Sequence, residues 1–200
     1  IENLFVNPLL KPERTQSFEA EVGRALSPAI YASLNAFVIR IHDPISYASP
    51  APSVNTYLNF DYTGAQGLEF QVKGRTASLS VEGSISYAQA RDREAAFYRV
   101  EGEEGYHVGF APLKGALQVQ WRFSEGWSFN PSLILYGPRY GYRYGETVPA
   151  KFHGTGLLDL YLTRTFGRGA ELGLRVGNVT DAAVPFIQPY GIPGVGGNAP

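Results

Sequence analysis

Residues 77–87 read Ala-Ser-Leu-Ser-Val-Glu-Gly-Ser-Ile-Ser-Tyr, and this stretch decides the fold class. Apolar residues or glycine occupy the odd positions, whereas serine or glutamate occupies the even positions. A period of two places successive side chains on opposite faces of a strand. The stretch is therefore predicted to be a β-strand with one apolar face and one small, polar face.

The same alternation recurs along the chain. Further strands are predicted at 57–73, 117–123, 158–163 and 170–176, and less regular ones at 15–23, 29–41 and 127–136. Within the last of these, Pro131 lacks an amide donor, which indicates a bulge or a local weakness in the ladder. The sequence thus predicts an all-β chain of about eight strands with no convincing helix.

The predicted connections alternate between short and long. The short ones are 24–28, 74–76, 124–126 and 167–168, and the long ones are about 43–56, 91–114, 138–154 and 180–200. Transmembrane β-barrels have short periplasmic turns and long extracellular loops, and they close because lipid cannot satisfy open strand edges. We therefore predict an antiparallel, up-and-down transmembrane β-barrel with a polar lumen face and an apolar lipid face.

Aromatic residues gather beside the predicted short turns. They are Trp121, Phe123, Trp127, Phe129 and Phe166. Such residues are typical of the girdle at a membrane interface, which here would be the periplasmic one. The alternative interpretation places them in the core of a soluble β-sandwich.

The composition excludes several function classes. A net charge of -1 offers no positive excess for releasing phosphate counterions, so no nucleic-acid partner is expected. The absence of Cys excludes disulfides, thiol nucleophiles and Cys-ligated zinc. No catalytic constellation, metal-ligand set or phosphate-cradling loop is recognisable, so we expect no enzyme and no resident cofactor. The chain begins at Ile1 without a signal peptide, and we expect a processed product or a fragment.

Three segments resemble motifs of TonB-dependent outer-membrane receptors. The first is Asn-Pro-Leu-Leu-Lys-Pro-Glu at 7–13, followed by Ser-Phe-Glu at 17–19. The second is Gly-Leu-Glu-Phe at 67–70, and the third combines Leu-Asp-Leu-Tyr at 158–161 with Leu-Arg-Val-Gly-Asn-Val-Thr-Asp at 174–181. The resemblance implies that residues 1–200 are the C-terminal portion of the receptor barrel, without the plug domain and the final strand. Barrels of this kind have about 22 strands.

The resemblance also implies a function and a location. A receptor of this family is a multi-pass β-barrel of the cell outer membrane that imports a scarce solute, such as an iron–siderophore complex. TonB energises the import through the plug region, so this segment would supply barrel wall and extracellular loops. The implied partners are outer-membrane lipid, lipopolysaccharide and a small-molecule ligand such as a metal chelate, with TonB reached through the plug.

The best candidate for ligand contact lies in the long connection at 138–154. Its residues are Arg139, Tyr140, Tyr142, Arg143 and Tyr144. Arginine pairs with carboxylate or catecholate oxygens, and tyrosine offers a flat ring with a polar tip, so an anionic iron chelate would suit this loop. The alternative interpretation is an extracellular aromatic girdle. The acidic run at 101–104 is interpreted as a solvated loop tip.

Two other function classes stay open from the sequence. One is a small freestanding outer-membrane barrel that acts as a pore or an adhesin, because eight strands can close alone. The other is a soluble carbohydrate-binding β-sandwich that uses Tyr and Trp for stacking. The sided loop lengths and the motif resemblance favour the receptor.

Overall fold

The computed structural model describes residues 4–51, 54–92, 100–103, 106–143, 146, 148–167 and 169–185. Within these residues the chain forms strands and no helix, and so no helix that could cross a membrane. The strands are β1 (Leu4–Phe5), β2 (Arg14–Ser27), β3 (Ile30–His42), β4 (Ile45–Ala51), β5 (Val54–Asn59), β6 (Tyr62–Arg75), β7 (Leu79–Asp92), β8 (Leu113–Ser124), β9 (Trp127–Phe129), β10 (Ser132–Tyr136), β11 (Arg139–Gly141), β12 (Ala150–Phe152), β13 (Thr155–Phe166) and β14 (Ala170–Val176).

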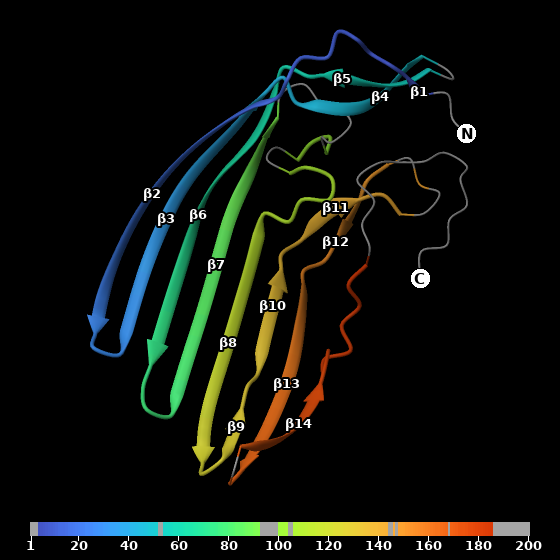
Figure 1. Cartoon of the computed structure of the whole chain (residues 1–200). Coiled ribbons are helices and arrows are strands. Elements are labelled where there is room, and N and C mark those ends of the chain that lie inside the picture. Colours follow the sequence, from blue (N-terminus) through green and yellow to red (C-terminus); the bar gives the residue numbers. More distant parts are fainter. Residues whose placement is uncertain are drawn as a thin grey trace.

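One antiparallel sheet makes up most of the structure (Figure 1). From one edge its order is β2, β3, β6, β7 and β8, then β9 with β10, then β13 and β14. Strands β9 and β10 both pair with β8 on one side and with β13 on the other, so they are two halves of one strand position. The sheet therefore has eight positions in up-and-down order, which confirms the predicted all-β, antiparallel arrangement.

The register confirms the two predicted faces, because directly opposite residues of an antiparallel pair share a face. One row across β2, β3, β6 and β7 holds Val22, Leu34, Phe70 and Ile85. The adjacent row, on the other face, holds Glu21, Asn35, Glu69 and Ser86. We call these the apolar face and the polar face of the sheet.

The apolar face is not covered by protein in the described part of the chain. Phe18 is 71% exposed, Val22 is 70% exposed and Leu172 is 67% exposed. The buried hydrophobic residues among those described, Val108, Ala111 and Tyr140, all lie outside the main sheet. A soluble sandwich would pack a second sheet on this face, so the described structure does not fit that alternative.

The sheet is open, since among the described residues β2 pairs with β3 alone and β14 pairs with β13 alone. The eight positions thus do not close into a barrel of their own. Two smaller sheets, β1–β5–β4 and β11–β12, lie at the end of the main sheet where the long connections are (Figure 1).

The structure corrects two predicted boundaries and explains a third. The predicted strand at 57–73 is divided into β5 and β6, and the predicted loop at 43–56 instead contains β4 and the start of β5. Strands β5 and β6 are separate because β5 pairs with β4 in a hairpin of its own. A hydrogen bond from the Phe60 amide to the Pro44 carbonyl (2.9 Å) closes the base of this hairpin. Pro131 does interrupt its strand, as predicted, and the two halves are β9 and β10.

The predicted aromatic cluster is present at the short-turn end of the sheet. Trp121 and Phe123 have ring centroids 5.3 Å apart, and Phe123 stacks with Trp127 at 6.3 Å. The Arg164 guanidinium lies 5.0 Å from the Trp127 ring centroid, and it donates to the Glu125 carbonyl at 2.7 Å. A cation that bonds a turn carbonyl above exposed aromatic rings is suited to an interface between lipid and water.

Candidate functional site

Four of the predicted ligand-contact residues, Arg139, Tyr140, Tyr142 and Arg143, lie on and beside the β11–β12 hairpin, at the long-loop end of the sheet. Arg139 is opposite Phe152 and Tyr140 is opposite Lys151 in this hairpin. The hairpin continues directly from β10 and leads back into β13, which are neighbours in the main sheet. Two strands of the wall therefore fix the position of the loop.

Tyr140 is the anchor of this region, because its side chain is only 7% exposed. Its hydroxyl donates a hydrogen bond to a carboxylate oxygen of Glu103, and its ring meets the Tyr106 ring edge-on at 5.2 Å and 78°. Its carbonyl accepts from the Gly109 amide at 2.7 Å, beside the bridge between Tyr140 and Val108. Tyr140 thus ties the connection between β7 and β8 to the β11–β12 hairpin.

The electrostatics of the anchor keep Tyr140 neutral and Lys151 charged. The hydrogen bond to Glu103 raises the pKa of Tyr140, with burial acting in the same direction. The neighbouring Tyr140 hydroxyl raises the pKa of Lys151, whose Nζ lies 5.4 Å from the Tyr140 ring centroid. The expectation of a solvated acidic tip is therefore wrong for Glu103, which is partly buried and bonded.

The two arginines point outward from the anchor. Arg139 is half-buried, with its guanidinium 5.3 Å from the Tyr136 ring centroid and 3.5 Å from the Pro185 carbonyl. Arg143 is exposed, with its guanidinium 5.7 Å from the Phe152 ring centroid. Aromatic faces hold cations in this way without neutralising them, so both guanidinium groups keep donors for an anion.

The structure gives less detail on the remaining predicted ligand-contact residues. Tyr142 is half-buried, and Tyr144 lies outside the described residues. The structure adds Lys151, which is exposed and which the sequence analysis missed. Only the hairpin register brings it beside Tyr140, and no local pattern in the sequence signals that pairing.

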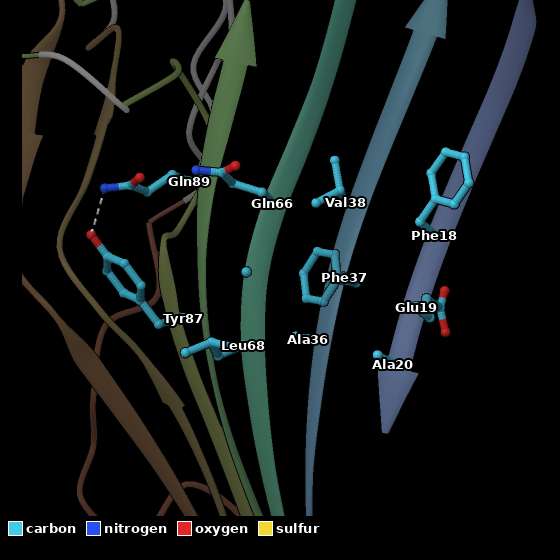
Figure 2. Close-up of a pocket in the computed structure, with 11 residues that line it drawn as sticks. Phe18, Glu19, Ala20, Ala36, Phe37, Val38, Gln66, Leu68, Tyr87 and Gln89 are labelled. Atoms are coloured by element: carbon cyan, nitrogen blue, oxygen red, sulfur yellow. Dashed lines mark hydrogen bonds between the residues drawn. The ribbon is translucent and has the colours of Figure 1, made fainter. Parts of the chain in front are cut away.

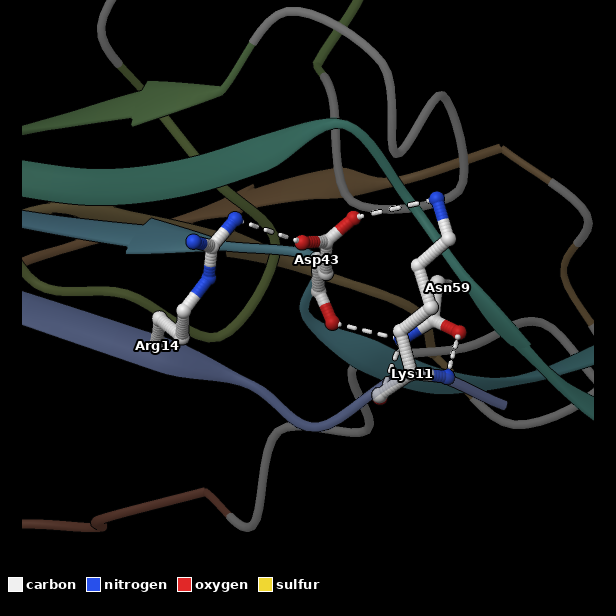
Figure 3. Close-up of polar contacts among 4 residues, drawn as sticks. All are labelled: Lys11, Arg14, Asp43 and Asn59. Atoms are coloured by element: carbon white, nitrogen blue, oxygen red, sulfur yellow. Dashed lines mark hydrogen bonds and ion pairs between the residues drawn. The ribbon is translucent and has the colours of Figure 1, made fainter. Parts of the chain in front are cut away.

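A second polar cluster holds the entry segment in place (Figure 3). The Asn59 side chain accepts from the Lys11 amide at 2.7 Å and donates to the carbonyls of Lys11 (2.9 Å) and Asp43 (2.7 Å). The Asp43 carboxylate lies 3.4 Å from the Arg14 guanidinium and 4.0 Å from Lys11 Nζ. This cluster joins the segment before β2 to the base of the β4–β5 hairpin, which is a structural role.

A third cluster closes the last hairpin. Asp159 pairs with Arg175 across β13 and β14 and accepts from the Asn178 amide at 2.8 Å. The Asn178 side chain accepts from the Ala182 amide at 3.0 Å, and both Asn178 and Asp181 have positive φ (47° and 48°). These contacts form the turn by which the chain leaves the sheet.

No group of three or more His, Asp or Glu side chains in the described ranges is arranged to hold a metal ion. The arrangement can therefore offer an anion several cations and aromatic rings, and the described side chains offer no preformed metal centre.

Comparison with known proteins gives a family match and a fold match. The model of the family described as TonB dependent receptor-like, beta-barrel, matches residues 2–179. The FrpB iron transporter from Neisseria meningitidis (F3-3 variant) superposes with a TM-score of 0.66 at 17% identity, covering 88% of this chain and 28% of that one. No match was found among curated proteins.

Two other solved structures have the same fold. The ferric-catecholate import receptor Fiu from E. coli K12 gives a TM-score of 0.64 at 18% identity, covering 86% of this chain and 24% of the receptor. The ferripyoverdine receptor of the Pseudomonas aeruginosa outer membrane, bound to ferripyoverdine, gives 0.63 at 16% identity, with coverages of 86% and 24%. The chain thus spans about a quarter of the length of the structures it matches.

Proposed function

Because the chain belongs to the family of TonB-dependent receptor-like β-barrels, we propose that it forms wall and extracellular loops of an outer-membrane importer. The imported solute would be an anionic metal chelate, such as an iron–siderophore complex. The observation that carries this proposal is the family match over residues 2–179, joined to a sheet that has one polar and one uncovered apolar face. The proposal concerns transport and gives the chain no catalytic step.

The size of the apolar face supports a location in the outer membrane. On β7 its residues run from Leu79 to Tyr87. Eight residue steps at about 3.3 Å are about 26 Å along the strand, or about 20 Å along the membrane normal at a tilt of about 40°. That height is close to the apolar band of about 25 Å in transmembrane barrels.

The open edges support a larger barrel, of which residues 1–200 would be the C-terminal portion. Among the described residues, no further strand pairs with the outer edge of β2 or of β14. Lipid offers no partner for such edges, so further strands would complete the wall. The plug domain and the final strand would belong to the rest of that protein, and TonB would act through the plug.

We place the ligand contacts at Arg139, Tyr142, Arg143 and Tyr144, with Tyr140 as the buried anchor that holds the hairpin. The cationic groups would pair with chelate oxygens, and the rings would lie against its flat groups. Lys151 adds a further charge beside the anchor.

The similar structures favour an iron chelate as the solute class. FrpB is an iron transporter, Fiu imports ferric catecholate, and the third receptor binds ferripyoverdine. A copper transporter, OprC, has the same fold with a TM-score of 0.62, so the fold alone does not set the solute. We therefore assign the selection of the solute to the residues of the long loops.

The test measures binding and uptake by the full-length protein. The probe is an iron(III)–catecholate complex, titrated into purified protein and supplied as radioactive iron to cells that depend on this protein for uptake. Arg139→Ala combined with Arg143→Ala should weaken binding about tenfold or more, as expected for the loss of charge-assisted bonds. Arg24→Ala combined with Arg75→Ala removes the same charge at the short-turn end and should leave binding unchanged.

Each result has a defined meaning. Equal binding by the two double variants would refute the assigned contacts. Uptake that continues after the proton gradient is dissipated would refute the TonB-energised step. Absence of the protein from the outer-membrane fraction would refute the receptor itself.

A further inference from the structure

The charges on the polar face of the sheet lie in two separate regions. On this face β2 and the middle of β6 present Glu19, Glu21 and Glu69. Strand β8 presents Lys114 and Arg122 there, and no residue of β8 is Asp or Glu. An anion is therefore repelled by one part of the wall and attracted by another.

Exposed amide groups lie between the two cations of β8. On the polar face this strand presents, in order, Lys114, Ala116, Gln118, Gln120 and Arg122, all of them exposed. We call the four polar side chains of this set the β8 track. Lys114 and Arg122 are eight residues apart, which is about 26 Å at about 3.3 Å per residue. A small anion therefore cannot contact both cations at once, and the amide donors of Gln118 and Gln120 occupy the interval.

The long-loop end of the β8 track adjoins the proposed ligand contacts. Lys114 is directly opposite Tyr136 of β10, and the Arg139 guanidinium lies 5.3 Å from the Tyr136 ring centroid. Lys114 Nζ lies 5.9 Å from the Phe110 ring centroid, a contact that holds a cation without neutralising it. An anion that leaves Arg139 would therefore meet Lys114 as the next cation along the polar face.

The carboxylates on the strands beside the β8 track are paired with cations. On β7, the Glu82 carboxylate lies 3.1 Å from Lys73 Nζ. On β13, Asp159 pairs with Arg175. Among the described residues, no carboxylate is within ion-pairing distance of Arg122. The neighbouring strands therefore leave the positive charge at the short-turn end of the track in place.

The opposite face of the sheet does not offer a hydrated anion a comparable path. There Phe18, Val38 and Leu68 help to line an open hollow between β2, β3 and β6 (Figure 2). An ion that moves against such apolar side chains loses water without gaining a partner, which is costly. Passage of an anion along this part of the wall is thus favoured on the polar face, and there on β8.

We propose that an anionic solute travels through the barrel along the β8 track, from Lys114 past Gln118 and Gln120 to Arg122. The inference rests on the proposed function, because it requires an anionic solute and a lumen on the polar side of the sheet. Several separate contacts of modest strength suit transit, since a solute that is held tightly at one site does not leave it. The track would be a second part of the solute site, beyond the loop contacts.

The first test separates binding from uptake in the full-length protein, with the iron(III)–catecholate complex as the probe. Gln118→Glu places a carboxylate in the middle of the track, and Gln71→Glu is the matched control on the same face of β6. One repelling charge at about 4 Å in water lowers the occupancy of a neighbouring anion about fivefold. Uptake at saturating probe should therefore fall about fivefold in Gln118→Glu and stay unchanged in Gln71→Glu, while the two variants bind the probe equally.

Arg122 provides a second test at the far end of the track. Arg122→Gln should lower the uptake rate without changing binding of the probe to the protein. Arg122→Lys keeps the positive charge and should restore uptake. Loss of uptake in both variants would assign Arg122 to a structural role and would contradict its place in the path.

A third measurement follows the solute on the wall itself. Iron(III) should quench a fluorophore attached at Gln118→Cys during energised uptake. It should quench less a fluorophore at Glu21→Cys, which lies four strand spacings, or about 19 Å, from β8.

The outcomes separate this path from the proposed function. Equal uptake by Gln118→Glu and Gln71→Glu, or equal quenching at residues 118 and 21, would overturn the path while wild-type protein still binds and imports the probe. Wild-type protein that neither binds nor imports the probe would contradict the proposed function, and the path with it.

Discussion

Gly126 offers a sharp test of the structure, because both its backbone angle and its surroundings exclude a side chain. It has a φ of +69° in the turn between β8 and β9. A Cβ there would lie closer than 3.0 Å to the Thr165 carbonyl oxygen. The Gly126 carbonyl also accepts from the Thr165 amide at 2.7 Å. The turn is therefore bonded to the adjacent strand at this residue, and the strand leaves no room for a side chain.

The magnitude for Gly126→Ala follows from two terms. A non-glycine residue in the left-handed region costs about 1–2 kcal/mol. Moving Thr165 away to relieve the overlap breaks a hydrogen bond worth about 1 kcal/mol. The expected loss in the free energy of unfolding is therefore about 2–3 kcal/mol.

Gly169 supplies the matched control at the same end of the sheet. Its φ is +82°, but a Cβ there would have no atom within 4 Å. Gly169→Ala should therefore cost only the backbone term, about 1–2 kcal/mol. The effect of alanine on the unfolded chain is common to both variants and cancels in their difference.

The assay is denaturant unfolding of the full-length protein in lipid vesicles, followed by tryptophan fluorescence and by heat-modifiable gel mobility. Gly126→Ala should unfold at a lower denaturant concentration than Gly169→Ala, by the equivalent of about 1 kcal/mol. Equal midpoints for the two variants would refute the contact between Gly126 and Thr165.

Three further predictions concern the long-loop end. Tyr140→Phe keeps the ring but loses the bond to Glu103, so the loop near 100–109 should be cleaved faster by protease; an unchanged rate would contradict the anchor. The fold raises the pKa values of Tyr140 and Lys151 above their ordinary values of 10.0 and 10.5. The stability that each protonated group contributes is therefore complete below its ordinary pKa and is lost as pH rises through its folded-state pKa. Protease protection of the loop should persist at neutral pH and fall in strongly alkaline buffer, and Lys151→Met should shift the pH of that fall. Asn59→Ala removes three hydrogen bonds, at a cost of about 3 kcal/mol, and should expose Lys11 to trypsin. Asn59→Asp should retain the bond from the Lys11 amide, so equal cleavage of the two variants would contradict the cluster.

The strands of the wall could be predicted from the sequence because each one separates two environments. Each residue on β7 faces either the apolar or the polar side, so apolar and polar residues alternate with a period of two at 77–87. The β4–β5 hairpin could not be predicted in the same way. It lies beyond the main sheet, where no apolar face imposes alternation. Its Ser and Pro residues also interrupt the alternating pattern by which a strand is predicted.

The candidate site was predicted only in part, because its decisive contact is long-range. Alternating aromatic and basic residues at 139–144 led to the prediction of a ligand-contact loop, which stays a prediction. They did not reveal that Tyr140 would be buried and hydrogen-bonded to Glu103, which lies 37 residues earlier in the chain. The same limit applies to Lys151, whose place depends on the register of β11 with β12.

The two ends of the sheet are stabilised by different means, and this difference bears on the proposed ligand contacts. At the short-turn end, backbone bonds and aromatic rings act within the wall itself, as at Gly126 and Trp127. At the long-loop end, separate side-chain clusters around Asn59 and Tyr140 each hold one loop. Residues such as Arg143 project from those clusters without supporting the wall. Under the proposed function, substitutions there would alter recognition at little cost to the sheet, whereas substitutions in the turns act on its stability.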